Sequence, residues 1–269
     1  MSGRTALRRL LASAGLLDAA RGARDAAWSV EWWRDNSEFW MRGAPDRLPV
    51  PPLRLVRSST GTSSLRWLFE GGQLAADSIA GILASNGIEM RQLESLLDFG
   101  CGCGRVIRQW AGLGPALHGS DYNRHSIAWC RRHLPFADFA VNELSPPLAY
   151  RDGHFALVYA LSVFTHLPEP LLFAWLREMR RVLKAGGWLV LSTHGESYLA
   201  ELSPDEQTQF RSGRLVVKFA DDAGTNRCGV YVSEEYTRQH FSDGFRVVDF
   251  VPQGAKGNPV QDLVLLQKT

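Results

Sequence analysis

The most informative segment of this 269-residue chain is Leu96-Leu97-Asp98-Phe99-Gly100-Cys101-Gly102-Cys103-Gly104-Arg105. Its apolar first part predicts a short buried strand over residues 93–99. The alternating glycines predict a sharp turn and room for a ligand, because glycine has no β-carbon to restrict the backbone or to block close approach. A strand that ends in such a turn is typical of parallel sheets that bind ligands at the carboxyl ends of their strands.

Strand and helix patterns alternate after this turn. We predict strands over residues 116–121, 136–141, 155–160 and 188–193. We predict helices over residues 105–111, 126–133 and 170–183. Late strands over 245–251 and 262–267 are joined by a hairpin-like link that lets the second run antiparallel. This order predicts an α/β fold, a Rossmann-like, mostly parallel seven-stranded sheet with helices on both faces and an antiparallel last strand.

The regions around this core have a different character. Residues 1–89 are predicted to be an N-terminal helical extension, with helices through about residue 27 and over residues 74–85. Between them, Trp28, Trp32 and Trp33 fit either a helix docked on the main body or a lid over a substrate pocket. We expect the core to span residues 90–269. After its fifth strand, an insert at about 196–242 holds a polar helix (204–210) and a β-prone run (215–219).

The glycine spacing distinguishes two kinds of ligand. Arg105 stands where the dinucleotide fingerprint G-x-G-x-x-G would place its third glycine. Asp98 precedes the turn by two residues, and an acid there favours a ligand with positive charge over a bare pyrophosphate. Asp121 ends the second strand about 20 residues after Gly100, where an acid hydrogen-bonds ribose hydroxyls in sheets of this type. The alternative role for Asp121 is to cap the helix that begins near Ser126.

Four segments in this order resemble those of one enzyme family. Residues 96–105 resemble the first motif of class I S-adenosylmethionine-dependent methyltransferases. Gly119-Ser120-Asp121-Tyr122-Asn123 resembles their ribose-binding motif, and residues 152–160 and 180–189 resemble the segments around their fourth and fifth strands. Ala156 and Ala185 depart from the family, which usually has an acid and a proline there, and these departures concern local packing.

The resemblance implies S-adenosyl-L-methionine as cofactor and places it on this sheet edge. Asp98 would lie near its ammonium, Asp121 would hold the ribose, and Ala160 would offer its backbone to the methionine part. Arg105 would either pair with the methionine carboxylate or cap the sheet edge, while the residues after the third strand would meet the adenine. The predicted cofactor-binding residues are Asp98, Gly100, Gly102, Gly104, Arg105, Asp121, Tyr122, Asn142, Glu143 and Ala160.

Two histidines are candidate catalytic residues. Methyl transfer from a sulfonium is an in-line displacement that chiefly requires alignment. A hydroxyl acceptor must also lose its proton, and histidine is the usual base. His166 follows the fourth strand and His194 ends the fifth, so both are expected at the carboxyl edge of the sheet. Each also suits a structural role, in helix capping or in bonding to backbone carbonyls.

The acceptor is expected to be a small molecule or a sugar-containing compound, because the extension and the insert suggest a covered pocket. The alternatives are a protein or nucleic-acid methyltransferase and a binding module without catalysis.

The 30 basic and 28 acidic residues nearly balance, so no nucleic-acid partner is expected. No apolar stretch is long enough to span a membrane, and we expect a cytoplasmic protein. The four cysteines lack metal-site spacing, so no metal is expected.

Overall fold

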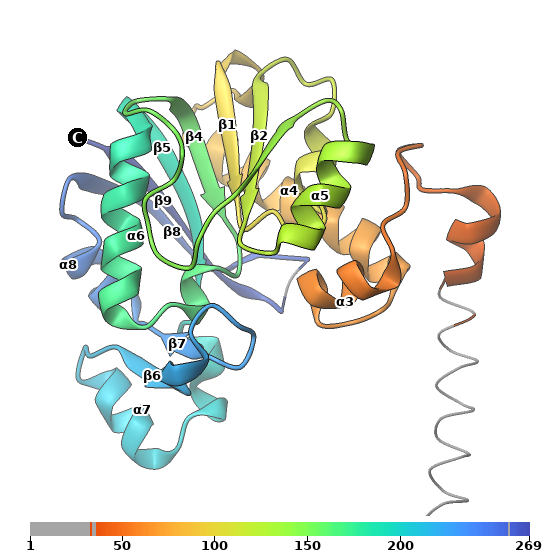
Figure 1. Ribbon diagram of the computed structural model, residues 1–269. Helices are drawn as coiled ribbons and strands as arrows, with labels where there is room; N and C mark the ends of the chain where they lie inside the picture. The colour runs from red at the N-terminus through yellow and green to blue at the C-terminus, as the bar shows by residue number, and fades with distance from the viewer. Residues whose placement is uncertain (1–32, 34–35, 258) are drawn as a thin grey trace, which may run out of the picture.

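The chain forms one central sheet covered by helices on both faces (Figure 1). The computed structural model describes Trp33 and residues 36–257 and 259–269. The predicted helix through residue 27, Trp28 and Trp32 lie outside the described residues. Helical residues 36–42 lead into the first labelled elements of the fold.

The sheet has seven strands in the order β3-β2-β1-β4-β5-β9-β8. Its first five strands are parallel, and β9 runs antiparallel to both β5 and β8. The predicted fold class is therefore confirmed. The strands are β1 (Ser95–Phe99), β2 (Ala116–Asp121), β3 (Asp138–Val141), β4 (Phe155–Ala160), β5 (Leu183–Thr193), β8 (Phe245–Ala255) and β9 (Gln261–Lys268).

The two faces of the sheet carry separate apolar clusters. Leu96 points to the face covered by α4 and α5, and the next residue, Leu97, points to the face covered by α6. This alternation explains the continuous apolar run in β1, since a strand buried on both faces needs apolar residues at every position. The helices are α3 (Leu53–Thr60), α4 (Leu65–Ser85), α5 (Arg124–His133), α6 (Glu169–Val182), α7 (Pro204–Arg211) and α8 (Glu234–His240).

The strand order reverses between β1 and β4, because the chain continues from β1 to β2 on one side and returns to β4 on the other. Ligands in open α/β sheets bind in the crevice at this point, outside the carboxyl ends of the strands. The glycine-rich turn leaves β1 directly into this crevice. The topology therefore places the turn over residues 100–104 where a ligand site is expected.

Several elements differ from the prediction. The helix predicted over residues 105–111 is only a 3-10 turn at Ile107–Trp110, because the positive φ angles of Gly104 and Gly112 end the helix on both sides. Helix α4 begins at Leu65, nine residues before the predicted start at residue 74, where Ser64 accepts a capping hydrogen bond from the Trp67 N–H. Elements without a predicted counterpart are α3, α8 and the strand β7 (Gly229–Tyr231), which pairs with β6 (Val216–Lys218).

Helix α4 touches the link between β8 and β9 backbone to backbone. A β-carbon on Gly257 would lie 2.0 Å from the carbonyl oxygen of Gly71, and the φ angle of Gly257 is +79°. We expect Gly257→Ala to lower the free energy of unfolding by about 3 kcal/mol. About 1 kcal/mol comes from placing alanine in the left-handed conformation, and the rest comes from pushing the link away from helix α4. Chemical denaturation of Gly87→Ala, with φ +73° and open space, isolates the backbone part. Equal losses in both variants would show that the close approach costs nothing.

Among the described helices, none combines the length and the apolar character that crossing a membrane requires.

Candidate functional site

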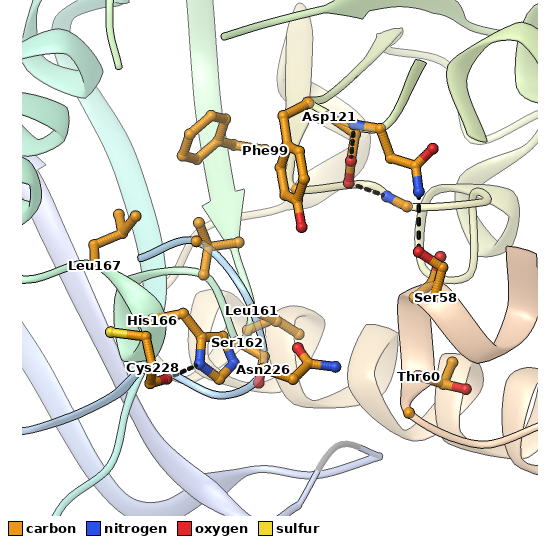
Figure 2. A pocket seen from close by; sticks show the side chains of 18 of the residues that line it. Ser58, Thr60, Phe99, Asp121, Leu161, Ser162, His166, Leu167, Asn226 and Cys228 are labelled. Carbon is orange, nitrogen blue, oxygen red and sulfur yellow. Dashed lines mark hydrogen bonds between the residues drawn. The ribbon is translucent and has the colours of Figure 1, made fainter. Parts of the chain in front are cut away.

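A cavity of about 620 Å³ opens at the carboxyl ends of β1, β2 and β4 (Figure 2). Its volume lies within the range of small-molecule sites. Gly104 and Ala160, which were also predicted to bind the cofactor, are buried and do not line it. The predicted site residues that line it are Asp98, Gly100, Gly102, Arg105, Asp121, Tyr122, Asn142, Glu143, His166 and His194. The structure thus brings together the glycine turn, both acids and both histidines.

Asp98 carries a buried carboxylate with unused bonding capacity. Its side chain is 4% exposed, and within the described chain its Oδ2 has no hydrogen-bond partner. Burial raises the pKa of Asp98 to about 7, while a hydrogen bond from Tyr159 and the charge of Arg105 act in the opposite direction. A buried acceptor of this kind is costly unless a ligand supplies a donor, and a cationic donor fits it best.

Both the backbone conformation and the packing require glycine at the turn. Gly100, Gly102 and Gly104 have φ angles of +83°, +53° and +82°, which glycine alone adopts readily. The β-carbons that these positions lack would meet the protein itself, at Val163, Ser59 and Leu134 respectively. The predicted sharp turn is therefore confirmed, and neighbouring elements pack directly onto it, while Gly100 and Gly102 also line the cavity.

Asp121 ties the glycine turn to the end of β2. Its Oδ2 accepts the Gly102 N–H at 2.8 Å, and its Oδ1 accepts the Asn123 N–H at 2.7 Å (Figure 2). Each carboxylate oxygen has a second lone pair, so the group can still accept hydrogen bonds from a ligand. The alternative that Asp121 caps the following helix is wrong, because Asn123 is the N-cap of α5.

The remaining predicted cofactor residues differ in how their side chains are used. Asn142 accepts a hydrogen bond from Ser120 Oγ at 2.6 Å and donates to the backbone of Glu143. The Glu143 side chain is exposed in an ion pair with Arg124. Arg105 is buried, and its Nη1 donates to the carbonyl oxygen of Gly257 at 2.8 Å. One bond of Arg105 therefore goes to a backbone carbonyl at the sheet edge.

Helix α3 forms a wall of the cavity that sequence reasoning missed. Ser59 Oγ accepts the Cys103 N–H at 3.1 Å, and Ser58 Oγ accepts from the Asn123 amide at 2.9 Å (Figure 2). The N-terminal region thus touches both binding turns, after β1 and after β2. The sequence feature that could have indicated this wall is the run of hydroxyl residues Ser58-Ser59-Thr60 before Gly61. Such runs are common at helix ends, so the feature does not by itself indicate a binding site.

The two histidines meet at the other end of the cavity, with ring centroids 6.0 Å apart. His166 Nδ1 lies 2.6 Å from the carbonyl oxygen of Cys228. A carbonyl can only accept, so Nδ1 carries the hydrogen and Nε2 keeps a free lone pair. Burial lowers the pKa of His166, which favours the neutral ring.

His194 is arranged differently. Its Nε2 lies 3.1 Å from the Gln261 amide nitrogen, so this lone pair is already occupied by a donor. Burial, and secondly the neighbouring His166, lower the pKa of His194 to about 4. Of the two predicted histidines, His166 alone thus keeps a ring nitrogen ready to take a proton.

Comparison with known proteins agrees with this geometry. Residues 97–191 match the family model described as a methyltransferase domain. A ubiquinone biosynthesis O-methyltransferase of Roseobacter denitrificans is 24% identical over 180 residues, which cover 66% of this chain and 64% of that relative. The chain therefore spans less than two thirds of that relative's length.

Solved structures share the fold at low identity. A methyltransferase from Methanosarcina mazei superposes with a TM-score of 0.52 at 21% identity, covering 69% of this chain and 96% of that one. A glycopeptide N-methyltransferase complexed with S-adenosyl-L-methionine gives a TM-score of 0.51 at 19% identity, covering 71% and 92%. The matched domain begins inside β1 and ends inside β5, so it contains the glycine turn, Asp121 and His166. Residues 97–191 are thus similar to a methyltransferase domain, and the sheet that contains them has the fold of solved S-adenosylmethionine-dependent methyltransferases.

Proposed function

We propose that the enzyme methylates a hydroxyl group of a small molecule, with His166 as the general base. The observation that carries the proposal is the hydrogen bond from His166 Nδ1 to Cys228, which directs the basic Nε2 away from the protein backbone. In Figure 2 the far side of the ring faces the open cavity, toward Asn226. Such a nitrogen suits an acceptor whose proton must leave as the new bond forms.

S-adenosyl-L-methionine, when bound, supplies a methyl group on a sulfonium. Asp98 would pair with its ammonium and Asp121 with its ribose. In the in-line displacement that this group makes possible, the acceptor oxygen would bond to the methyl carbon as the carbon–sulfur bond breaks, and His166 Nε2 would take the hydroxyl proton. Alignment of oxygen, carbon and sulfur is the main requirement, so a rigid pocket wall serves the reaction directly.

The size and lining of the cavity support a small acceptor. Its far wall comes from the insert after β5, including Tyr198, Phe219 and Tyr231, and α3 closes the opposite side. These elements leave about 620 Å³ for cofactor and acceptor together. The relatives include both a named O-methyltransferase and a named N-methyltransferase. We favour oxygen because an amine acceptor that is already neutral would not need the His166 base.

The direct test measures methyl transfer to panels of hydroxylated small molecules, amines, peptides and RNA. Transfer confined to hydroxyl compounds is the expected result. Transfer to peptides or RNA would favour the alternative of a macromolecular acceptor. Tight cofactor binding without turnover on any class would favour a binding module.

Cofactor binding is expected to depend on pH through Asp98. Because its pKa is about 7 in the free protein, the group loses its charge as the pH falls below this value. The affinity for S-adenosylhomocysteine, which carries the same ammonium, should then fall by up to about tenfold per pH unit below 7 and be constant above it. Calorimetric titrations between pH 5.5 and 8 measure this. Asp98→Asn should bind more weakly and without that slope, and a wild-type affinity independent of pH would contradict the assignment.

A further inference from the structure

A buried polar network joins β9 to the acceptor end of the cavity. Gln261, the first residue of β9, is 1% exposed, so its side-chain amide must be bonded within the protein. Its Oε1 accepts from Ser192 Oγ at 2.7 Å. Its Nε2 lies 2.7 Å from Ser162 Oγ and 3.1 Å from His194 Nε2. One side chain thus contacts residues from the ends of both β4 and β5.

The network holds the backbone in an unusual conformation at the end of β4. Ser162 has a φ angle of +57°, which is rare for a residue with a side chain, and its N–H donates to Ser192 Oγ at 2.8 Å. Strained residues persist where the surroundings determine them strongly, and they gather at functional sites. Ser162 lines the cavity, and His166 follows it by one short turn. Gln261 therefore lies behind the segment that carries the proposed base.

The tautomer of His194 follows from the same side chain. An amide NH₂ group only donates, so His194 must accept at Nε2 and stays uncharged while Gln261 holds this orientation. The ring then packs against Tyr198 and Tyr231, at centroid distances of 4.2 and 5.2 Å, and stands edge-on to His166. A charged ring at that place would oppose proton uptake by its neighbour.

We infer that Gln261 is a positioning residue for catalysis. It keeps the His194 ring uncharged and in place beside His166, and it holds Ser162 at the end of β4. The inference rests on the proposed role of His166 for its catalytic part, but the state of His194 is measurable without turnover. The titratable groups packed around His194 are His166, Tyr198 and Tyr231. Further out are Glu201, which accepts from the Tyr231 hydroxyl, and Asp262, which packs on Gly195.

The test is Gln261→Glu, which keeps the shape and replaces the donor with a carboxylate that stabilises a protonated His194. Imidazole NMR should show the pKa of His194 rising from about 4 by about two units. Once an acceptor has been identified, the kcat of Gln261→Glu should show a new ionisation near pH 6 and fall about tenfold below that pH. The KM for the cofactor should stay within about twofold of the wild-type value. Gln267→Glu on the same strand, at its other end, is the matched control and should leave both readouts at wild-type values.

Distinct outcomes would overturn the inference. It fails if His194 in Gln261→Glu titrates as in the wild type, or if wild-type His194 carries its proton on Nε2. It also fails if His194 becomes more basic while the pH profile stays unchanged. If Gln261→Glu does not fold, Gln261→Met removes the donor at similar length, and a mixture of His194 tautomers is then expected. Full activity in a His166 variant would instead contradict the proposed function and leave the NMR result standing.

Discussion

His166→Asn should lower kcat by about 100- to 10,000-fold, the usual contribution of a general base. Asparagine is the informative replacement because its amide N–H can still donate to the Cys228 carbonyl, which His166 Nδ1 contacts at 2.6 Å. The variant therefore keeps the local bond and loses only the proton acceptor. Affinity for S-adenosylhomocysteine should stay within about twofold, since no predicted cofactor residue is changed.

The measurement is single-turnover methyl transfer at saturating cofactor, with calorimetry for binding. His125→Asn serves as control, because His125 is exposed on α5 and does not line the cavity. Loss of the rate in His166→Asn alone would support the base. A His166→Asn enzyme that turns over at the wild-type rate would remove it, and the reaction would then depend on alignment alone.

Asp121→Asn should weaken cofactor binding by about 100-fold. The carboxylate holds two backbone N–H groups, and an amide can accept at only one oxygen. The amide would also lose the charge-assisted bonds proposed to the ribose, each worth about 1.5–3 kcal/mol. One buried backbone N–H is left without an acceptor, so the free energy of unfolding should also fall by about 1–3 kcal/mol.

Calorimetry with S-adenosylhomocysteine and chemical denaturation separate these two effects. Asp138→Asn is a suitable control, since Asp138 is exposed at the start of β3, opposite His118 on β2, and does not line the cavity. If Asp121→Asn is less stable but binds the ligand as the wild type does, Asp121 has only the structural role of joining the two turns.

Much of the fold was predictable because its strands are short and bounded by clear signals. The strands predicted over residues 116–121 and 155–160 have the observed bounds; Gly114-Pro115 and Asp152-Gly153 precede the two runs, and Asp121 ends the first of them. The segment over residues 105–111 was harder: its apolar spacing suggests a helix, but the backbone angles of the flanking glycines decide the outcome. Helix α3 was missed because prolines at 51 and 52 resemble a loop, whereas Pro52 stands at its N-cap.

The candidate site was predictable where its residues stand at the ends of strands. It was less predictable where segments distant in the sequence supply its contacts. Asp98, Asp121 and the two histidines stand at or just after the carboxyl ends of strands, so topology alone brings them together. Nothing local indicates that Ser59 would close on the glycine turn or that Gln261 would occupy His194 Nε2, since their partners lie 44 and 67 residues away in sequence. Such long-range contacts depend on the assembled sheet.

The place of β9 in the sheet has a consequence for synthesis on the ribosome. Strand β9 follows β8 in the chain yet lies between β5 and β8. A nascent chain that has already emerged through β5 therefore leaves the edge of that strand without its partner until about 70 further residues have been made, several seconds at ordinary elongation rates. During this interval the β5 edge is open to pairing with another chain, and His194 lacks its amide neighbour. Late insertion of one strand thus completes the sheet and the acceptor wall together.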